Sequence, residues 1–373
     1  MEVKRLSFLV TNDLNFDQRM QRICSTLSEA GFDVELIGRR RKNSLPLTQK
    51  SFLQKRLFCF FERSFLFYAE YNLRLFFYLL FRRTDLICAI DLDTILPAYY
   101  ISKWRGLERV YDAHEYFTEL PELVDRPKVK QVWEWIADRY IPRFKYAYTV
   151  GASLCVLLQE RYGPHFALIR NVARKSEAVI KQERSYKLPL QVLYQGALNK
   201  GRGIEALLEA LNLNSDFNLW IAGEGDLSQV LRQQAKALGI EDRVRFFGFL
   251  RPEALKDLSA KADLGVNLIE NMGLSYYYSL ANKTFDYMQA GIPAIHMDYP
   301  EYRKLQDEYQ AFYLIKELKA SQIAQCLAHI AEHKEEWQQK QQACLEASNI
   351  LCRESEAQVL ISFYQSIKKG SRS

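Results

Sequence analysis

Cysteine and histidine are sparse in this sequence, and they are not spaced as a metal site or a disulfide framework would require. The seven cysteines are scattered through 373 residues without any C-x-x-C pair, and the five histidines form no H-E-x-x-H pattern. Structural zinc sites and disulfide-rich folds depend on such spacings. We therefore expect no metal site, and a reducing, cytoplasmic environment for the thiols.

Long apolar runs are also missing. The first residues, MEVKRLSFLV, hold too short an apolar run for a signal peptide, and no stretch reaches the roughly 18 apolar residues of a membrane-spanning helix. This predicts a soluble protein or one that is peripheral at the inner face of a membrane. The formal net charge is +6, with basic residues concentrated in 39–42 and around 50–83, which suggests an anionic partner. Nucleic acid is not expected, because these residues build no recognised nucleic-acid-binding module.

Residues 50–83 are dense in Phe, Leu and Tyr that are broken regularly by Lys, Arg and Glu. The favoured interpretation is one or two helices buried in the first domain, because helices packed on a parallel sheet are apolar over a wide face. The alternative is a peripheral membrane contact, in which the basic residues lie near anionic headgroups.

Short apolar strands alternate with helical stretches along the whole chain, which predicts an α/β fold with parallel sheets. Strands are expected at 6–10, 33–38, 85–90, 110–115 and 147–151 in the first half, and at 190–198, 218–226, 244–250, 263–269 and 293–298 in the second. The polar stretch 172–188 is the candidate linker. We therefore expect two doubly wound, Rossmann-like domains facing a central cleft, covering 1–172 and 188–352, with residues 353–373 as a final helix.

The stretch SLANKTFDYMQAG, residues 279–291, predicts a helix over 281–289 with Ser279 as its cap and Gly291 as its end. Lys283 in the first turn opposes the positive end of the helix dipole, but a phosphate bound at that end would remove the conflict. Asn282 and Asp286 share one side of that turn with Lys283, and a carboxylate there suits a ribose diol. The structural alternative is a solvated Lys–Asp pair.

Glycine-rich turns follow two strands of the second half. The turn after residue 195 contains Gly196, Gly201 and Gly203 with the cations Lys200 and Arg202, and a second turn contains Gly223 and Glu224. Glycines permit close approach of the backbone to a ligand, and Arg binds a diphosphate in bidentate fashion. Together with the 279–291 helix, these turns predict a nucleotide-diphosphate site.

The chain resembles the retaining GT-B glycosyltransferases of the group called glycosyltransferase family 4 (group 1). The resemblance covers nearly the whole chain and rests on these segments: TNDLNFDQRMQRICSTLSEAGFDVELIGR (11–39), IDLDTILPA (90–98), YDAHEYFTE (111–119), GRG (201–203), AGEGD (222–226), FFGFL (246–250) and NKTFDYMQAGIPAI (282–295). It implies a GT-B fold, with a nucleotide-diphosphate sugar as the donor substrate in the second domain, no cofactor, and a final helix in residues 353–373 that crosses back to the first domain.

The resemblance also implies roles for single residues. Arg202 corresponds to a diphosphate-binding lysine, Asp286 to the ribose-binding acid of a paired-acid motif, and His114 to a residue that reaches the donor sugar. Phe249 and Leu250 would lie by the nucleobase. The first acid of the pair corresponds to Tyr278, and Glu270 is the candidate replacement. From the residues alone, His114 is equally well explained as a structural residue at a strand end.

The predicted site therefore has three groups. The catalytic candidates are His114, Arg202 and Lys283. The donor-binding candidates are Gly196, Gly203, Gly223, Glu224, Phe249, Leu250, Glu270, Ser279, Asn282 and Asp286. The acceptor-binding candidates are Asn12, Asp13, Asp17, Arg19, Asp91 and Asp93, of which the last two are equally well explained as turn or helix-cap residues.

These observations favour a glycosyltransferase that uses a saccharide or lipid-linked saccharide acceptor in surface polysaccharide assembly. Retention of configuration is implied by the resemblance alone. Two alternatives stay open. A nucleotide-sugar epimerase of the same architecture would form product without an acceptor. A catalytically silent partner in a glycosyltransferase complex would bind nucleotide without turnover, or bind none.

Overall fold

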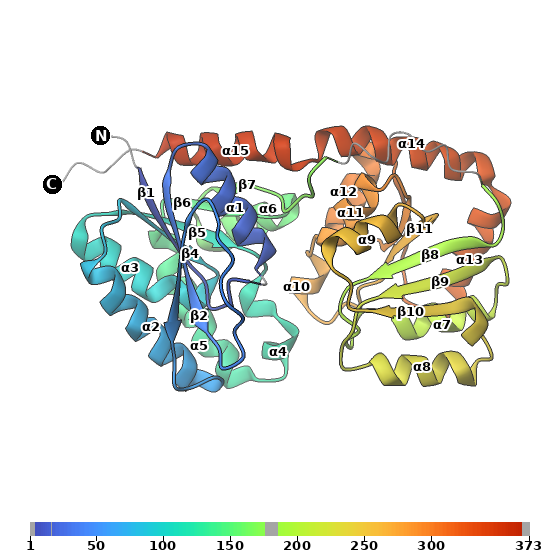
Figure 1. Ribbon diagram of the computed structural model, residues 1–373, viewed down its shortest axis with the longest axis horizontal. Coiled ribbons are helices and arrows are strands. Elements are labelled where there is room, and N and C mark those ends of the chain that lie inside the picture. Colours follow the sequence, from blue (N-terminus) through green and yellow to red (C-terminus); the bar gives the residue numbers. More distant parts are fainter. Residues whose placement is uncertain (1–3, 16, 176–185, 368–373) are drawn as a thin grey trace. The chain divides into compact units, whose positions relative to one another are not determined.

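The computed structural model describes residues 4–15, 17–175 and 186–367. The chain forms two compact units, one of residues 1–171 with 356–373 and the other of residues 172–355 (Figure 1). Residues 176–185 of the expected linker and residues 368–373 of the expected final segment lie outside the described residues.

The first unit contains a seven-stranded parallel sheet in the order β3-β2-β1-β4-β5-β6-β7. Its strands are β1 Arg5–Leu9, β2 Asp33–Arg40, β3 Leu53–Phe58, β4 Leu86–Ile90, β5 Glu108–Ala113, β6 Tyr146–Thr149 and β7 Phe166–Leu168. The five strands expected in this half are all present. The two edge strands, β3 and β7, were not expected: Lys and Arg interrupt the apolar residues of β3, and β7 is only three residues long.

The second unit contains a six-stranded parallel sheet in the order β10-β9-β8-β11-β12-β13. Its strands are β8 Leu190–Gln195, β9 Phe217–Ala222, β10 Val244–Gly248, β11 Leu264–Asn267, β12 Ala294–Met297 and β13 Phe312–Ile315. The expected strands are again present, and β13 is an additional edge strand. The prediction of two doubly wound, Rossmann-like sheets is confirmed.

Helices connect and cover the strands of both sheets. Those of the first unit are α1 Gln18–Glu29, α2 Ser64–Phe81, α3 Ile95–Arg105, α4 Pro121–Val124, α5 Pro127–Tyr140 and α6 Ala152–Tyr162. Those that follow are α7 Ile204–Asn212, α8 Ser228–Ala237, α9 Pro252–Ser259, α10 Leu274–Tyr277, α11 Asn282–Gln289, α12 Pro300–Tyr309, α13 Ala320–Glu332, α14 Lys334–Ile350 and α15 Arg353–Ser366.

The helices of the first unit form two layers, one on each side of its sheet (Figure 1). Helices α2, α3, α5 and α6 bury residues such as Leu75 and Ile101 in one core. Helices α1 and α15 bury residues such as Leu27 and Tyr364 in another core on the opposite side. The final helix thus completes the first unit, where the Tyr364 ring packs on Phe8 of β1.

The favoured expectation for residues 50–83 is confirmed in part, because the segment contains the helix α2, one side of which is buried in the first unit. The segment begins with the edge strand β3 rather than a helix, and α2 buries only one of its sides, leaving residues such as Phe65, Phe77 and Phe81 exposed. Apolar composition predicted burial but carried no information about which side of the helix would find a partner. Within the described residues, no helix combines the length and apolarity that crossing a bilayer requires.

Each sheet has one point at which the strand order reverses. In the first sheet this point lies between β1 and β4, and in the second it lies between β8 and β11. Open α/β sheets bind their ligands at such points, beyond the carboxyl ends of the strands. The loops after β1, β4, β8 and β11 are therefore where functional side chains should gather.

Candidate functional site

The turn after β8 brings its backbone unusually close to the next strand. A Cβ atom on Gly223 would lie 1.8 Å from the carbonyl oxygen of Gly196, and Gly223 has a φ of +151°. Gly203, with a φ of +68°, caps α7, and a Cβ there would lie 2.3 Å from the carbonyl oxygen of Leu268. Only glycine fits at these two positions. They set the path of the loop that carries Arg202.

Helix α11 begins at Asn282 with Ala281 as its cap residue, which makes no side-chain capping hydrogen bond, and the Ala281 N–H donates to the Tyr302 hydroxyl at 3.2 Å. The prediction that Ser279 caps this helix was wrong. The Ser279 hydroxyl instead donates to the carbonyl of Tyr276, 2.7 Å away, and so completes the preceding turn of α10. The position of Ser279 in the sequence allowed its hydroxyl to bond either to the helix that follows or to the turn that precedes it. The N-terminal turn of α11 therefore lacks a side-chain cap, which suits an anion-binding role.

Lys283 lies in the first turn of α11 and is largely enclosed. Its Nζ atom sits 4.2 Å from the centre of the Tyr194 ring, and a Cβ on Gly196 would lie 3.4 Å from that atom. Burial lowers the pKa of Lys283 to about 7, repulsion from Arg202 contributes in the same direction, and Asp286 opposes the shift. The site therefore holds a lysine that is readily deprotonated near neutral pH.

Arg202 is the second cation of this site. Its guanidinium lies 5.2 Å from the centre of the Tyr276 ring, and its Nε atom is buried without a hydrogen-bond partner among the described residues. The lowered pKa of Lys283 reports that the two cations lie close enough to repel each other. Two partly desolvated positive groups at a sheet switch point form an environment that a bound anion would stabilise.

Asp286, one turn deeper in α11, is positioned by the end of β8. Its Oδ2 accepts a hydrogen bond of 2.8 Å from Gln195 Nε2, and Gln195 Oε1 accepts one of 3.2 Å from Ser259. Sequence reasoning missed Gln195 and Ser259, since neither stands in a recognisable motif. Their role follows from the chain of side-chain hydrogen bonds alone.

The remaining donor-binding candidates lie after neighbouring strands. Phe249 is 79% exposed just after β10, beside the half-buried Leu250, and Glu224 after β9 pairs with Arg232 at 3.2 Å. The exposed Glu270, after β11, is tied to the glycine turn by its backbone N–H, which donates to the carbonyl of Gly201.

The alternative first acid, Tyr278, has a different environment. Its ring packs edge-on against Tyr277, with the ring centres 5.1 Å apart. Glu270, in contrast, supplies a carboxylate, and its backbone N–H is hydrogen-bonded to Gly201 in the turn that carries Arg202.

In the first unit, the side chains after β1 and β4 meet at the switch point. Thr11 donates a hydrogen bond of 2.5 Å to Asp93. Burial raises the pKa of Asp93 to about 6, and the hydrogen bond from Thr11 limits the rise. Asp91 has a φ of +53°, a conformation that costs a non-glycine residue about 1–3 kcal/mol. Asp91 precedes the short 3-10 helix 92–94 but makes no side-chain capping hydrogen bond to it.

A buried charge network lies beside these aspartates. The Arg19 guanidinium contacts Asp112 at 3.0 Å, and Asp112 in turn contacts Nε2 of His114 at 3.1 Å. The backbone N–H of His114 donates to Asp91 at 2.9 Å, whereas Nδ1 of His114 is 3.8 Å from that carboxylate. Arg19 is buried in this network, so it acts on the site through Asp112 rather than by lining a pocket.

The His114 imidazole is protonated at neutral pH. Burial alone would lower its pKa, but the carboxylates of Asp112 and then Asp91 outweigh burial and raise the pKa to about 9. Arg19 and His114 together hold the pKa of Asp112 below its usual range despite its burial. His114 is therefore suited to donate hydrogen bonds and not to accept a proton as a general base.

The raised pKa of His114 predicts a pH-dependent stability of the first unit. A raised folded-state pKa gives a contribution that is complete below pH 6.5 and is lost as the pH rises through about 9. We expect the wild type to lose about 2 kcal/mol of unfolding free energy relative to His114→Gln across that range. Urea denaturation of both proteins at the two pH values checks this. An equal loss in both would show that His114 forms no stabilising ion pair.

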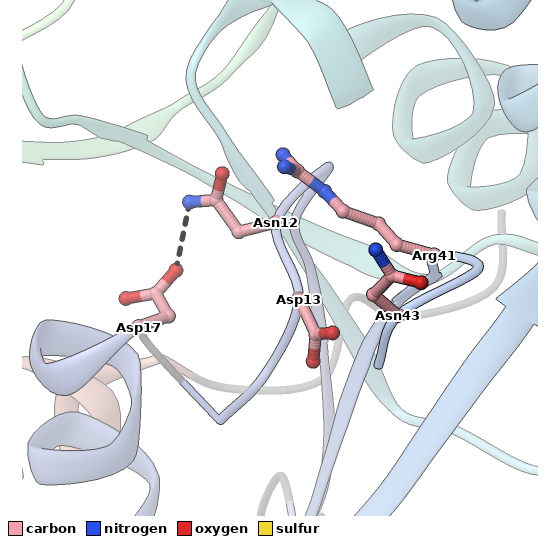
Figure 2. A pocket seen from close by; sticks show the side chains of 5 residues that line it. All are labelled: Asn12, Asp13, Asp17, Arg41 and Asn43. Carbon is pink, nitrogen blue, oxygen red and sulfur yellow. Dashed lines mark hydrogen bonds between the residues drawn. The ribbon is translucent and has the colours of Figure 1, made fainter. Parts of the chain in front are cut away.

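A pocket of about 520 Å³ lies beside this switch point and is lined by Asn12, Asp13, Asp17, Arg41 and Asn43. Figure 2 shows the Arg41 side chain extending toward Asn12, which in turn donates to Asp17 Oδ2 at 3.1 Å. The structure thus joins three of the predicted acceptor residues and adds two that were missed. Arg41 and Asn43 come from the segment after β2, far from β1 in sequence, and no motif marks them.

Two of the pocket aspartates also have structural roles. Asp17 caps α1 by accepting a hydrogen bond of 3.0 Å from the N–H of Met20. Asp13 is held by Arg56 at 3.1 Å and by the hydroxyl of Ser44. Burial would raise the pKa of Asp13, but these contacts lower it, so its carboxylate is ionised in the pocket wall.

One histidine pair is spaced four residues apart at the junction of α13 and α14. The rings of His329 and His333 stack at 4.0 Å, and Nε2 of His329 contacts Glu336 at 2.7 Å. Within the described residues, no group of three or more potential ligands is arranged to hold a metal ion.

Comparison with known proteins supports the architecture. Residues 175–347 match the family model described as "Glycosyl transferases group 1". No curated protein sequence matches the chain significantly. The match is thus confined to the part of the chain that carries Arg202, Lys283 and Asp286.

Several solved structures are similar over nearly their whole length. A sucrose-phosphate synthase from Thermosynechococcus elongatus has a TM-score of 0.78 at 14% identity, covering 97% of this chain and 98% of that one. HepE from Anabaena, in complex with UDP and glucose, has a TM-score of 0.73 at 14% identity, with 98% and 100% coverage. The apo lipopolysaccharide outer core galactosyltransferase WaaB has a TM-score of 0.69 at 14% identity, with 96% and 98% coverage. The fold is therefore the GT-B fold, and residues 175–347 match the model of the group 1 glycosyl transferases.

Proposed function

We propose that this protein is a glycosyltransferase that moves a sugar from a nucleotide-diphosphate sugar to a hydroxyl group of a saccharide or lipid-linked saccharide. The observation that carries the proposal is the position of two cations at the switch point of the second sheet: Arg202 follows β8, and Lys283 in the first turn of α11 reaches back to Gly196 at the end of β8. Asp286 lies one turn deeper in the same helix, where a ribose diol can donate to it. Cations for a diphosphate and an acceptor for ribose are what a nucleotide donor requires.

The proposed reaction breaks the bond between the anomeric carbon and the diphosphate oxygen and forms a bond from that carbon to the acceptor oxygen. The acceptor proton passes to the departing diphosphate, so no side-chain nucleophile is needed. Negative charge develops on the diphosphate, and Arg202, Lys283 and the first N–H groups of α11 are positioned to balance it. This chemistry needs neither a cofactor nor a metal ion. Retention of configuration is part of the proposal and rests on the family resemblance.

The other donor contacts follow from the same strand ends. The exposed Phe249 ring, with Leu250, is a platform for the nucleobase, and Glu270 is the carboxylate for the donor sugar. The role of His114 toward the donor sugar is part of the proposal and rests on the family resemblance; its Nδ1 is 3.8 Å from Asp91 and can donate to another acceptor. HepE, one of the similar structures, is in complex with UDP and glucose, so UDP-sugars are the first donors to test.

The acceptor is proposed to bind the first unit in the pocket of Asn12, Asp13, Asp17, Arg41 and Asn43. Amide and carboxylate groups recognise hydroxyls, and the exposed Arg41 adds a positive charge. The similarity to a lipopolysaccharide outer core galactosyltransferase supports a role in surface polysaccharide assembly.

Removal of Arg41 should therefore weaken acceptor binding alone. We expect Arg41→Ala to raise the acceptor KM by about ten-fold, as the loss of one charge-assisted hydrogen bond implies, with the donor KM unchanged. Initial rates with each substrate varied in turn check this. A rise in the donor KM instead would place Arg41 in the donor site.

The test of the proposed function is acceptor-dependent turnover. The protein is incubated with each nucleotide sugar, with and without mixtures of saccharide and lipid-linked acceptors, and release of nucleoside diphosphate is measured. We expect release that depends on an acceptor and is lost in Arg202→Met. An epimeric sugar formed without an acceptor would instead show an epimerase. Nucleotide binding without any turnover would show the silent partner suggested by Tyr278 in place of the first acid.

A further inference from the structure

Helix α2 is apolar on two opposite sides, which the fold of the first unit does not require. Phe67, Tyr71, Leu75 and Leu79, spaced four residues apart, are buried against the sheet. Leu73, Phe77 and Phe81 have the same spacing but are offset by two residues, and they are 57%, 54% and 85% exposed. Two residues turn an α-helix by about 200°, so this second stripe points away from the core. A surface helix normally carries polar residues there.

The neighbouring helices of the same layer extend this apolar surface. Helix α2 packs beside α3, and α3 beside α5. Trp104 of α3 is 69% exposed and Trp135 of α5 is 60% exposed, and the other tryptophans of the described residues are partly or fully buried. Figure 1 shows the three helices on the same side of the first sheet. We call this surface the aromatic face and define it by Phe65, Leu73, Phe77, Phe81, Trp104 and Trp135.

Exposed phenylalanine side chains are concentrated in the same part of the chain. Among the described residues, the exposed phenylalanines other than Phe249 all lie between residues 58 and 81. Scattered single apolar residues on a surface need no explanation, whereas a cluster of large aromatic ones marks a binding surface. Tryptophan is enriched where a protein meets the boundary between lipid and water.

Positive charge surrounds the aromatic face. Residues 50–83 contain seven basic and two acidic residues, and two of the basic ones, Arg56 and Arg82, are paired with Asp13 and Glu35 elsewhere in the chain, which leaves an excess of three positive charges. Arg63 and Arg83 are exposed at the two ends of α2, and Lys103 is exposed in the last turn of α3. Each such residue near an anionic membrane contributes about 1 kcal/mol, or roughly five-fold in affinity.

We infer that the aromatic face docks the first unit on a membrane surface that contains anionic lipid. The aromatic side chains enter the interface between headgroups and acyl chains, and the arginines contact the headgroups. A second copy of this chain fits the face less well, because a two-fold interface would bring the same cations together. The inference does not depend on the proposed sugar transfer, and it supplies a reason for an acceptor that is attached to lipid.

The experiment measures vesicle binding of the full chain by flotation. Vesicles of phosphatidylcholine alone are compared with vesicles that also contain phosphatidylglycerol, at about 50 mM and 500 mM salt. We expect binding to the anionic vesicles at low salt, at least ten-fold weaker binding to the neutral ones, and weakening at high salt. Phe77→Ser/Phe81→Ser and Arg63→Glu/Arg83→Glu should each lower the affinity at least ten-fold.

The matched control is Leu213→Ser/Val230→Ser, which removes two exposed apolar side chains from the second unit and should bind like the wild type. The Phe variants replace exposed residues, and an unchanged melting temperature shows that they fold. Equal vesicle binding by wild type and Phe variant, or no wild-type binding at low salt, would overturn the inference. A dimer in light scattering that the Phe substitutions dissociate, without vesicle binding, would instead make the face a self-association surface. No donor is present, so the result is independent of transfer activity.

Discussion

Replacement of Lys283 by methionine should lower kcat for sugar transfer roughly 10²–10³-fold. The reason is that Lys283 and Arg202 are cations at the switch point of the second sheet, and charge on the departing diphosphate is greatest in the transition state. Methionine keeps the length and apolar stem of lysine, so contact with the Tyr194 ring is retained while the charge is lost. Initial-rate kinetics at saturating donor measure the effect.

The matched control for this prediction is Lys236→Met. Lys236 lies in the last turn of α8, which leads back toward the amino end of β10 and away from the strand ends that carry the candidate site. It should leave kcat unchanged. A loss of less than ten-fold in Lys283→Met would contradict a transition-state role for Lys283, and a comparable loss in both variants would point to a general effect of surface charge.

Nucleoside diphosphate binding should weaken as the pH rises above about 7, by up to ten-fold per pH unit and approaching 100-fold at about pH 9. In the free protein, burial and Arg202 lower the pKa of Lys283 to about 7, so the ammonium loses its proton above that pH. A bound diphosphate favours the ammonium and raises this pKa again. Binding above pH 7 must therefore take up a proton. Calorimetric titration in buffers of different ionisation enthalpy measures that uptake.

Lys283→Arg provides the control, because a guanidinium keeps its charge across this range. Its affinity should be independent of pH between about 7 and 9. Protonation of the ligand phosphate, which has a pKa of about 6, weakens binding at lower pH in both proteins and cancels in the comparison. A pH-independent affinity in the wild type would show that Lys283 is charged in the free protein or does not contact the diphosphate.

The sequence predicted the central strands of both parallel sheets well because parallel strands buried on both faces are continuous apolar runs. The edge strands β3, β7 and β13 were missed: β3 contains charged residues, and β7 and β13 are apolar runs of only three and four residues. The sequence also predicted which residues share a turn after the same strand, such as Gly196 and Arg202. Such residues are close in sequence, so their spacing along the chain is enough to predict that they lie in one turn.

Contacts between distant segments were not predictable in the same way. Arg41 and Asn43 join the Asn12 pocket only because β2 lies beside β1, and Gln195 reaches Asp286 only because β8 adjoins the helix after β11. Arg19 was expected to contact an acceptor, but its partner Asp112 lies on another strand and draws it into the buried network. The Ser279 hydroxyl could bond either to the first turn of α11 or to the turn before it. The structure of α10 places the carbonyl of Tyr276 within its reach.

Thermal stabilisation by a panel of nucleoside diphosphates and nucleotide sugars tests the central claim most directly. A ligand at about 100 times its Kd adds roughly 2.7 kcal/mol of stability, which should raise the melting temperature of a unit of this size by about 5 °C or more. We predict a selective shift with one nucleotide that is lost in both Arg202→Ala and Asp286→Ala. A shift that survives both substitutions would contradict the proposed donor site, and the absence of any shift would contradict nucleotide binding itself.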